Sequence, residues 1–390
     1  MPVLKRAGTD FNQQRRPVKT SGEDVWEAVN HAVNKGGSPQ TMRAMILAGG
    51  DATRLRPLTV YTPNPLVPIA NQPLLKYQIE ILKRAGFREV TLVLGYHSNK
   101  IEDAMGDGRE QKISIRYQEQ SSSQGTAGAF RSAMGTADEP AVVLYGDILT
   151  DLTLDRMIAF HREKKSLLTV AMVTVENPGN YGVIEATPEG RVTKFVEKPG
   201  TANGGGNTIN AGIYVIEPEV IRMIPAGEKY SFEEQLIPAL IEGGKSIHAF
   251  SWRGYWTHLG NVRSYLEANL DLLAGRLRGL SGGSPARPLA DHQLAGEGEA
   301  AARIDHLSLI DPGCTIKPGA EIINSVLGPG CFIEERTRIE NSVLLTGVRV
   351  GKAADIRHSF IGKSSIIGRN TRVTDAIFGD KTSLSDYSVG

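Results

Sequence analysis

The sequence predicts an α/β protein: a mostly parallel sheet covered by helices, followed by a separate solenoid of short strands. Two observations lead to this architecture. From Met42 onward, short apolar segments alternate with amphipathic segments of helical period, which is typical of strand–helix–strand units. Over residues 303–390, apolar residues recur at a fixed spacing of 17, and a fixed short period is typical of coils that stack on one another.

The size and charge of the chain narrow its class. A chain of 390 residues is long for one hydrophobic core and favours two domains. Lysine and arginine number 44 against 43 aspartates and glutamates. The basic excess that is usual in a nucleic-acid-binding protein is missing, so we expect no nucleic acid partner.

The sequence also gives indications of the compartment. The two cysteines, Cys314 and Cys331, are too few for a disulfide framework and fit a reducing cytosol. No apolar run reaches the ~20 residues of a membrane span, and the N-terminus lacks the apolar region of a secretory signal. We therefore expect a cytoplasmic protein with no membrane partner.

Residues 1–41 form a polar N-terminal extension. Within it, residues 21–24 have the spacing of a helix capping box, and apolar residues at helical spacing follow them. A helix this short is marginal on its own. The extension is therefore either a short helix on a polar tail or a docking element for a partner or a neighbouring subunit.

The first domain, residues 42–275, is predicted to alternate strands and helices. The expected strands are Met42–Leu47, Val90–Leu94, Ile113–Tyr117, Ala141–Tyr145 and Leu167–Val175. The expected helices between them are Pro73–Ala85, Asn99–Met105, Thr126–Met134 and Leu154–Lys164. Such alternation predicts a mostly parallel sheet with helices on both faces.

Later segments complete this domain. We expect three closely spaced strands to fold over one end of the sheet: Tyr181–Ala186, Val192–Val196 and Ala211–Val215. The remaining expected elements are a helix over Phe232–Glu242, a strand over Ser246–Trp252 and a helix over Val262–Leu273. Residues 276–302 are rich in glycine and proline, which predicts a linker.

Residues 303–390 contain three columns of apolar residues with a spacing of 17. The columns are Ile310, Leu327, Leu344, Ile361 and Phe378; then Ile316, Ile333, Val350, Ile367 and Leu384; then Ile322, Ile339, Ile356 and Val373. The steps within one repeat are 6, 6 and 5 residues. Each repeat therefore predicts a triangular, hexapeptide-type coil with one short strand per side, which buries its apolar residues against the neighbouring coils.

Residues suited to phosphate binding follow the first strand directly. Leu47, Ala48, Gly49 and Gly50 lead into a loop that contains Arg54. Main-chain N–H groups at a glycine turn can approach an anion closely, and arginine adds charge for a phosphate. Tight packing between the strand and the loop explains the two glycines equally well. The segment has neither the Gly-Lys-Ser/Thr of a P-loop nor the third glycine of the dinucleotide fingerprint.

The segment Leu47–Ile69 (LAGGDATRLRPLTVYTPNPLVPI) resembles the signature of nucleoside-diphosphate-sugar pyrophosphorylases, which are sugar-1-phosphate nucleotidyltransferases. Further motifs match in the family's order: Gln124–Gly128, Gly146-Asp147, Tyr181-Gly182, Glu197-Lys198-Pro199, Asn210–Tyr214 and Trp256–Gly260. The C-terminal coils resemble the left-handed parallel β-helix that many members carry. The resemblance covers residues 42–390 and implies a Rossmann-like nucleotidyltransferase domain followed by this β-helix.

The resemblance implies a reaction and its ligands. In this family a phosphate oxygen of a sugar-1-phosphate attacks the α-phosphorus of a nucleoside triphosphate, which releases pyrophosphate and leaves an NDP-sugar. Such chemistry depends on positioning and on charge neutralisation, and the resemblance implies Mg²⁺ as the cofactor. The expected ligands are therefore a nucleoside triphosphate or NDP-sugar and a sugar-1-phosphate.

The resemblance also implies roles for individual residues. Those expected at the nucleotide are Leu47, Ala48, Gly49, Gly50, Gln118 and Gly125. Those expected at the sugar are Gly182, Glu197 and Asn210. The expected catalytic residues are Arg54 at the leaving phosphates, Asp147 at the metal and Lys198 at the sugar phosphate. Outside the family context, Asp147 would be as well explained as a turn former, and Glu197 and Lys198 as a solvated strand end.

Three positions depart from the family signature. Asn64 replaces the lysine of a Pro-Lys-Pro motif, which contacts the nucleotide phosphates in the family. His258 replaces the second metal carboxylate, and imidazole suits Mn²⁺ better than Mg²⁺. Ala52 replaces the last glycine of the phosphate loop and adds a Cβ. Because one lost charge contact costs ~10²–10³ in rate, these substitutions predict weakened turnover.

Two functions stay open from the sequence. The chain is either an active sugar-1-phosphate nucleotidyltransferase with altered metal or phosphate handling, or an inactive relative that binds nucleotide or NDP-sugar and regulates an active partner. A third function, an acyltransferase working from the coils, would use His358, which an ordinary turn explains better. We expect an oligomer, of this chain or with an active paralogue, because exposed coil faces and sheet edges often pair.

Overall fold

The computed structural model describes residues 42–50, 53–95, 98–120, 124–200, 206–280 and 301–390. The N-terminal extension, Ala52 and residues 281–300 of the linker lie outside these ranges, and so do the predictions made for them. Within the described ranges, no helix is both long and apolar enough to cross a lipid bilayer.

The elements of the first domain lie close to their expected positions. Its strands are β1 (Arg43–Ala48), β2 (Pro68–Ile69), β3 (Gln72–Pro73), β4 (Glu89–Leu94), β5 (Ser114–Glu119), β6 (Ala141–Tyr145), β7 (Ile148–Thr150), β8 (Leu168–Thr174), β9 (Gly182–Ala186), β10 (Val192–Glu197), β11 (Thr208–Ile216), β12 (Ile247–Ser251) and β13 (Trp256–His258). Its α-helices are α2 (Leu74–Arg84), α3 (Ser98–Met105), α4 (Gly125–Met134), α5 (Leu154–Lys164), α6 (Pro218–Met223), α7 (Ile237–Glu242) and α8 (Val262–Leu273). Short 3₁₀ turns are η2 (Thr53–Leu55), η3 (Leu58–Val60), η4 (Asn64–Leu66) and η5 (Pro178–Asn180), and η6 (Phe232–Leu236) is a π-helix that precedes α7.

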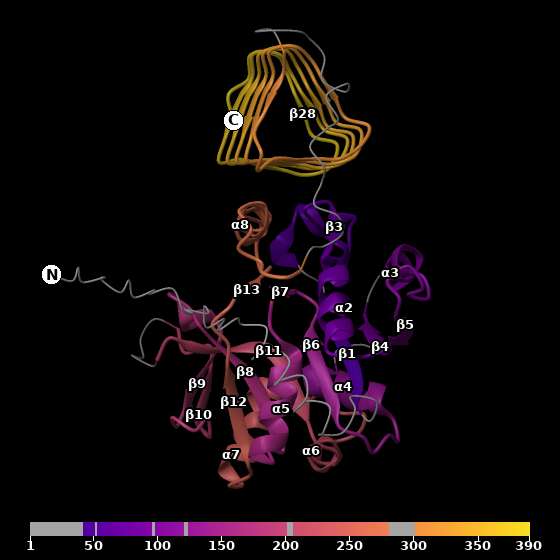
Figure 1. Cartoon of the computed structure of the whole chain (residues 1–390), viewed down its shortest axis with the longest axis vertical. Coiled ribbons are helices and arrows are strands. Elements are labelled where there is room, and N and C mark those ends of the chain that lie inside the picture. Colours follow the sequence, from indigo (N-terminus) through magenta and orange to yellow (C-terminus); the bar gives the residue numbers. More distant parts are fainter. Residues whose placement is uncertain (1–41, 51–52, 96–97, 121–123, 201–205, 281–300) are drawn as a thin grey trace, which may run out of the picture. The chain divides into compact units, whose positions relative to one another are not determined.

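The central sheet has a parallel part and an antiparallel part (Figure 1). The strands β6, β1, β4 and β5 are neighbours in this order, and all are parallel, as the strand–helix alternation predicts. The prediction that three later strands fold over one end of this sheet is wrong. β11 pairs antiparallel with β6, β8 and β9, and β10 pairs with β9, so these strands extend the same sheet.

Helices cover both faces of the sheet, as predicted. Successive residues of β1 point to opposite faces: Ala44, Ile46 and Ala48 join one hydrophobic cluster, whereas Met45 joins another. The first cluster includes buried residues of α2, α3, α5 and α8, and the second includes those of α4, α6 and α7. Ligands of open α/β sheets bind outside the carboxyl ends of the parallel strands, so the loops after β1 and β6 are the expected place for a site.

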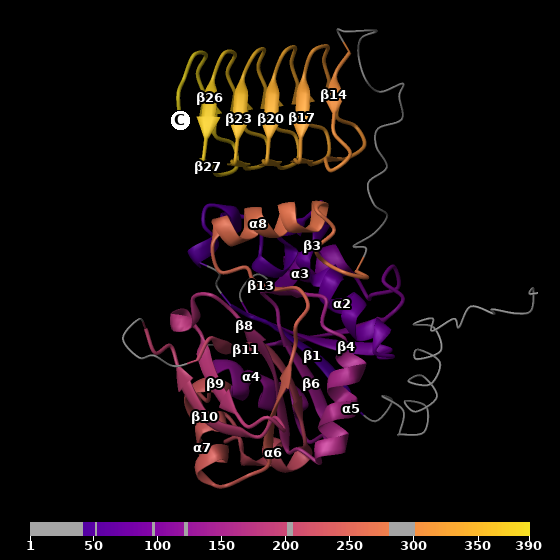
Figure 2. The same ribbon diagram turned by 60° about the vertical axis from the view of Figure 1, so that its left-hand side comes forward.

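The second domain consists of three parallel sheets of five strands each. The first sheet contains β14 (Arg303–Ile304), β17 (Glu321–Ile323), β20 (Arg338–Glu340), β23 (Asp355–Arg357) and β26 (Arg372–Thr374). The second contains β15 (Leu309–Ile310), β18 (Val326–Leu327), β21 (Val343–Leu344), β24 (Phe360–Ile361) and β27 (Ile377–Phe378). The third contains β16 (Thr315–Ile316), β19 (Phe332–Ile333), β22 (Arg349–Val350), β25 (Ile366–Ile367) and β28 (Ser383–Leu384). The coils are triangular in Figure 1, and Figure 2 shows the strands of the first sheet stacked one per coil. The domain is the predicted left-handed parallel β-helix.

The predicted apolar columns fill the interior of the β-helix. Ile333, Leu344 and Ile356, one from each column, are each 0% exposed. The corners are polar turns: His358 has a φ of 45°, and Asn341, one coil earlier, has a φ of 47°. Asparagine tolerates this left-handed conformation, and the same geometry at His358 matches the turn interpretation of this histidine.

The second sheet of the β-helix is also apolar on its outer face. Val326, Val343 and Phe360 are each 1% exposed and belong to the same hydrophobic cluster as α8. The rings of Phe360 and Tyr265 lie edge to face, with centroids 5.5 Å apart. First-domain residues therefore cover this sheet, which is an apolar contact that the inward columns alone did not predict.

Candidate active site

Asp147 and His258 meet beyond the carboxyl end of β6. Asp147 lies between β6 and β7, and His258 ends β13, which pairs antiparallel with β7. The N–H of Leu259 donates to the carbonyl oxygen of Asp147 at 2.9 Å, which holds the two segments together. Nε2 of His258 lies 3.1 Å from Oδ2 of Asp147. The two side chains are 20% and 36% exposed, so a ligand can reach both residues that the family pattern assigns to the metal.

Tyr181 and Arg54 border this pair. The rings of Tyr181 and His258 meet edge to face, with centroids 5.9 Å apart. Burial raises the pKa of the Tyr181 phenol, the Arg54 guanidinium lowers it and the Asp147 carboxylate raises it. Because both charges act on the same phenol, Arg54, which is exposed on η2, lies in the same region as Asp147.

Lys198 lies just after β10 and joins this region through Tyr181. Its N–H donates to the carbonyl oxygen of Tyr181 at 3.1 Å. Its Nζ lies 2.9 Å from Oε1 of Glu197, and this hydrogen bond raises the pKa of Lys198. A φ of 44° at Lys198 is unusual for a residue with a side chain, and such positions often mark functional sites.

Glu197 presents a buried oxygen that has no donor within the described part of the chain. Its Oε2 is buried and makes no hydrogen bond there. A Cβ at Gly182 would overlap Cζ of Phe195 and lie 2.8 Å from this oxygen, so any larger residue would displace these two side chains. An unpaired buried acceptor costs ~1–3 kcal/mol, which a hydroxyl group of a ligand would recover.

The glycine turn after β1 lies beside Asp147. The N–H of Gly146 donates to the carbonyl oxygen of Leu47 at 2.8 Å, which places Leu47 and Ala48 next to this residue. A Cβ at Gly49 would lie 2.8 Å from Oε1 of Gln120, so close packing accounts for this glycine. A Cβ at Gly50 would meet nothing within 4 Å, so Gly50 faces open space.

Gln120, rather than Gln118, contacts the glycine turn. Gln118 is exposed on β5, and its Nε2 lies 3.5 Å from the carbonyl oxygen of Glu119. Gln120 follows the end of β5, where its N–H donates to the carbonyl oxygen of Leu94 at 2.7 Å. Sequence reasoning missed Gln120 because nothing in the strand pattern shows where the chain turns back toward β1.

Asn210 and the segment after Gly125 are joined by Glu233. Nδ2 of Asn210 donates to the hydroxyl of Tyr214 at 2.6 Å, and this hydroxyl donates to Oε1 of Glu233 at 3.2 Å. Oγ1 of Thr126, directly after Gly125, donates to Oε2 of Glu233 at 3.1 Å. Sequence reasoning missed Glu233, because a glutamate near the start of a helix is ordinarily explained by the helix dipole.

Asn64 is not linked by hydrogen bonds to this group within the described residues. It begins η4, which packs against α2 and α3. Its Oδ1 is buried and without a hydrogen-bond partner in the described ranges, and within them no hydrogen bond or ion pair joins Asn64 to Asp147 or His258. Two lysines contact the residues that precede Asn64 in the chain. Nζ of Lys100 donates to the carbonyl oxygen of Tyr61, and Nζ of Lys363 donates to Oγ1 of Thr62, each at 2.9 Å.

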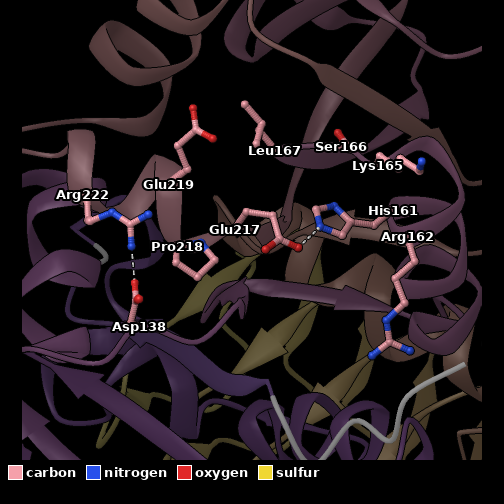
Figure 3. Close-up of a pocket in the computed structure, with 10 residues that line it drawn as sticks. All are labelled: Asp138, His161, Arg162, Lys165, Ser166, Leu167, Glu217, Pro218, Glu219 and Arg222. Carbon is pink, nitrogen blue, oxygen red and sulfur yellow. Dashed lines mark hydrogen bonds and ion pairs between the residues drawn. The ribbon is translucent and has the colours of Figure 1, made fainter.

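A cavity of about 590 Å³ lies at the other end of the sheet (Figure 3). Figure 3 shows His161 facing Glu217, with Nε2 and Oε1 3.0 Å apart, and Arg222 paired with Asp138. None of the site residues expected from the sequence lines it. Asp138 precedes β6 whereas Asp147 follows it, so this cavity is separate from the candidate active site.

Both domains match known protein families. Residues 43–275 match the nucleotidyl transferase family, and residues 304–389 match the GMPPB C-terminal domain family. Mannose-1-phosphate guanylyltransferase 1 of Arabidopsis thaliana is 34% identical over 360 residues, which are 90% of this chain and 94% of the relative.

Two further relatives have related names. The UTP–glucose-1-phosphate uridylyltransferase of Synechocystis sp. is 31% identical over 320 residues, 73% of this chain and 82% of the relative. A mannose-1-phosphate guanyltransferase of Aspergillus oryzae is 34% identical over 232 residues, 58% of this chain and 63% of the relative. The chain therefore belongs to the nucleotidyl transferase family and carries a GMPPB-type C-terminal domain.

Proposed function

We propose that this chain is a sugar-1-phosphate nucleotidyltransferase, which converts a nucleoside triphosphate and a sugar-1-phosphate into an NDP-sugar and pyrophosphate. The observation that carries the proposal is the grouping of Asp147, His258, Tyr181 and Lys198 beyond the carboxyl end of β6, beside the glycine turn after β1. The relatives are named for mannose-1-phosphate and glucose-1-phosphate, so hexose-1-phosphates are the proposed sugar substrates.

Each residue has a distinct task in the proposed reaction. Lys198 holds the phosphate of the sugar-1-phosphate in line with the α-phosphorus. A bond forms between these two groups while the bond to the leaving pyrophosphate breaks, and Arg54 neutralises the charge that leaves. Glu197 accepts a hydrogen bond from a sugar hydroxyl through its unpaired Oε2. No covalent nucleophile from the protein is needed, because positioning and charge stabilisation do most of the work in such transfers.

The donors at Asp147 and His258 fit a divalent cation, and they fit Mn²⁺ better than Mg²⁺. Mg²⁺ prefers oxygen donors, whereas imidazole nitrogen suits Mn²⁺, Co²⁺ or Zn²⁺. Among the residues that the structure describes, no three His, Cys, Asp or Glu side chains are grouped so that they could hold a metal ion. Asp147 and His258 would hold the cation from the protein side, and substrate phosphates would supply further ligands, as is usual for cations bound with nucleotides. When bound, the cation neutralises phosphate charge.

Asn64 and His258 weaken this proposed activity and favour a second candidate function. Each removes a charge that the family pattern places at the phosphates or at the metal, and one such loss costs ~10²–10³ in rate, although these losses are rarely additive. The second candidate is a chain that binds nucleotide or NDP-sugar without turnover and regulates an active partner. The contact between His258 and Asp147 favours it, because the carboxylate oxygen expected at the metal is already engaged.

A substrate panel with two metals separates the candidates. The full chain is incubated with GTP and mannose-1-phosphate, or with UTP and glucose-1-phosphate, in Mg²⁺ or Mn²⁺, and pyrophosphate release is measured. We expect release, faster with Mn²⁺. Calorimetry with the same triphosphates and the corresponding NDP-sugars measures binding in parallel. Binding without pyrophosphate release selects the regulatory candidate, and the absence of binding to every ligand refutes both.

A further inference from the structure

The carboxylate of Glu233 lies at the centre of a hydrogen-bond network that the proposed reaction does not use. Glu233 belongs to the π-helix η6, and π-helical turns are rare and frequent at functional sites. Oγ of Ser231 accepts from the N–H of Glu233 at 3.1 Å and donates to Oε2 of the same residue at 2.7 Å. The start of the helix therefore holds this side chain in one orientation.

Three hydroxyl groups from other elements donate to the same carboxylate. Thr126 of α4 donates to Oε2, while Tyr145 of β6 and Tyr214 of β11 donate to Oε1. A carboxylate offers about four acceptor positions, so these hydroxyls and that of Ser231 fill it. Burial, reinforced by the charge of Glu233, raises the pKa of both tyrosines well above its usual value, so both phenols stay protonated and donate.

Tyr214 transmits this arrangement to Asn210. The N–H of Gly212 donates to Oδ1 of Asn210 at 2.9 Å, and Nδ2 of Asn210 donates to the Tyr214 hydroxyl at 2.6 Å. A backbone N–H can only donate, so the amide oxygen of Asn210 must face Gly212 and the amide NH₂ must face away. Within the described residues, Tyr214 accepts one of the two amide hydrogens, and the second has no acceptor there.

We propose that Glu233 is a positioning residue that sets the sugar preference of the site through Tyr214 and Asn210. The Glu233 carboxylate is the nearer of two acceptors for the Tyr214 O–H, at 3.2 Å against 3.4 Å for the Tyr145 hydroxyl, and keeps this O–H directed at it, so the Tyr214 oxygen stays an acceptor for Asn210. Asn210 then presents its second N–H in one fixed direction, and a hexose with a hydroxyl oxygen on that line is favoured over its epimer. This inference rests on the proposed function, since it takes Asn210 to face the sugar.

Replacement of Glu233 by glutamine should exchange donor and acceptor in one hydrogen bond of this network. The new amide places an N–H donor against hydroxyls that now donate, and one of them has to rotate. If the Tyr214 oxygen accepts from the glutamine, it competes with Asn210, and the Asn210 amide loses its anchor. Tyr214→Phe removes the same anchor without any change of charge, so both variants should weaken binding of the sugar in the same way.

The experiment compares ligands with and without a hexose. Dissociation constants of GDP-mannose, UDP-glucose, GTP and UTP are measured by calorimetry for the full chain. For the sugar nucleotide that the wild-type chain prefers, we expect Glu233→Gln and Tyr214→Phe to weaken binding about tenfold, the scale of one hydrogen bond. Binding of the triphosphate, which lacks the hexose, should change less than about twofold, because the network acts through Asn210.

Matched controls repeat the same chemical changes elsewhere. Glu217→Gln alters a carboxylate that pairs with His161 at the separate cavity of Figure 3, and Tyr265→Phe removes a buried hydroxyl that donates to the Pro68 carbonyl. Neither variant should change the ratio between the dissociation constant of the preferred sugar nucleotide and that of the corresponding triphosphate. Thermal unfolding of every variant is recorded, and Tyr214→Phe carries the test if Glu233→Gln does not fold.

A double-mutant cycle separates positioning from general support of the fold. If Glu233 and Tyr214 act through Asn210, then Tyr214→Phe adds nothing to the loss already caused by Asn210→Ala. Additive losses in the cycle would overturn the inference, and so would an unchanged ratio of the sugar-nucleotide and triphosphate dissociation constants in both single variants. In either case, binding of nucleotide and sugar nucleotide by the wild-type chain would leave the proposed function intact. Failure of the wild-type chain to bind any of the four ligands would overturn the proposed function itself.

Discussion

Nε2 of His258 lies 3.1 Å from Oδ2 of Asp147, at the place where the family signature has two carboxylates. Two carboxylates would offer oxygen donors alone, which a hard cation prefers, whereas this pair offers one oxygen donor and one nitrogen donor. The pair also satisfies itself when no cation is bound, so a cation has to replace an existing contact. Cation choice is therefore the property in which we expect this chain to differ most from its relatives.

We predict that His258→Asp changes the preferred cation from Mn²⁺ to Mg²⁺. The substitution restores an all-oxygen donor set, and kcat/KM measured with Mg²⁺ should rise about 10–100-fold, toward the value of one recovered charge contact. Competition of Mg²⁺ against bound Mn²⁺, followed by electron paramagnetic resonance, tests the site without turnover. His306→Asp makes the same change at an exposed histidine of the β-helix. Equal competition in wild type and His258→Asp would remove His258 from the metal site.

Asn64→Lys should raise kcat/KM for the triphosphate, through a lower KM, without loss of stability. The new ammonium supplies the cation that the family signature places at the nucleotide phosphates, so KM for the triphosphate should fall about tenfold or more. The substitution also removes the buried Oδ1 of Asn64, which has no hydrogen-bond partner in the described ranges, and an orphaned acceptor is costly. Asn99→Lys on the exposed surface of α3 adds the same charge as a control. A fall in KM equal for both variants would mean that net charge alone is responsible.

Periodic parts of the sequence predicted periodic parts of the fold. The helices Leu154–Lys164 and Val262–Leu273 have the predicted bounds, because apolar residues at helical spacing mark a helix without any knowledge of its partners. The pairing of β11 was not predictable in this way. Its neighbours β6, β8 and β9 are chosen by contacts between distant segments, and strand pattern alone does not say which edge a strand joins.

The candidate site depended far more on family motifs than on pattern. Asp147 and His258 are 111 residues apart, and no spacing rule joins them. Gln120 and Glu233 carry no motif at all, and only the tertiary structure shows their contacts. The outer apolar column of the β-helix was visible in the sequence, since Val326, Val343 and Phe360 also recur every 17 residues. The coils need only their inner columns to bury an apolar interior. An additional outer column therefore indicates that another part of the chain packs against this face of the β-helix.

His161 makes stability depend on pH. It is 1% exposed, with Nδ1 2.8 Å from Oγ1 of Thr169 and Nε2 3.0 Å from Oε1 of Glu217. Burial lowers its pKa below the ordinary 6.5, although Glu217 opposes this shift. Between pH 6.5 and the lower pKa of the folded state, His161 binds more protons in the unfolded chain than in the folded chain. The free energy of unfolding therefore falls as the pH drops through 6.5 toward the folded-state pKa.

We predict that His161→Gln flattens this dependence. Urea midpoints measured between about pH 7 and pH 5 should fall less steeply in the variant than in the wild type, because one proton-linked group is gone. A residual slope is expected from His248, whose pKa burial also lowers. His306→Gln, at an exposed histidine, is the matched control substitution. Identical slopes in His161→Gln and wild type would show that His161 does not titrate differently in the two states.

Phe360→Ala should destabilise the first domain although the residue belongs to the β-helix. Phe360 is 1% exposed and packs against Tyr265 of α8, and truncation of a buried phenylalanine typically costs about 3–5 kcal/mol. Ile366→Ala, on the third sheet and 51% exposed, should change the free energy of unfolding by less than about 0.5 kcal/mol.

The tryptophans allow this effect to be assigned to a domain. None of the three lies in the β-helix, so their fluorescence in a urea titration reports on residues outside it, while circular dichroism reports on the whole chain. If docking through Phe360 stabilises the first domain, the fluorescence midpoint moves to lower urea in Phe360→Ala together with the circular dichroism. If the circular dichroism alone moves, the cavity weakens the coils but not the first domain, and the outer apolar column then contributes nothing to the stability of the domain that holds the site.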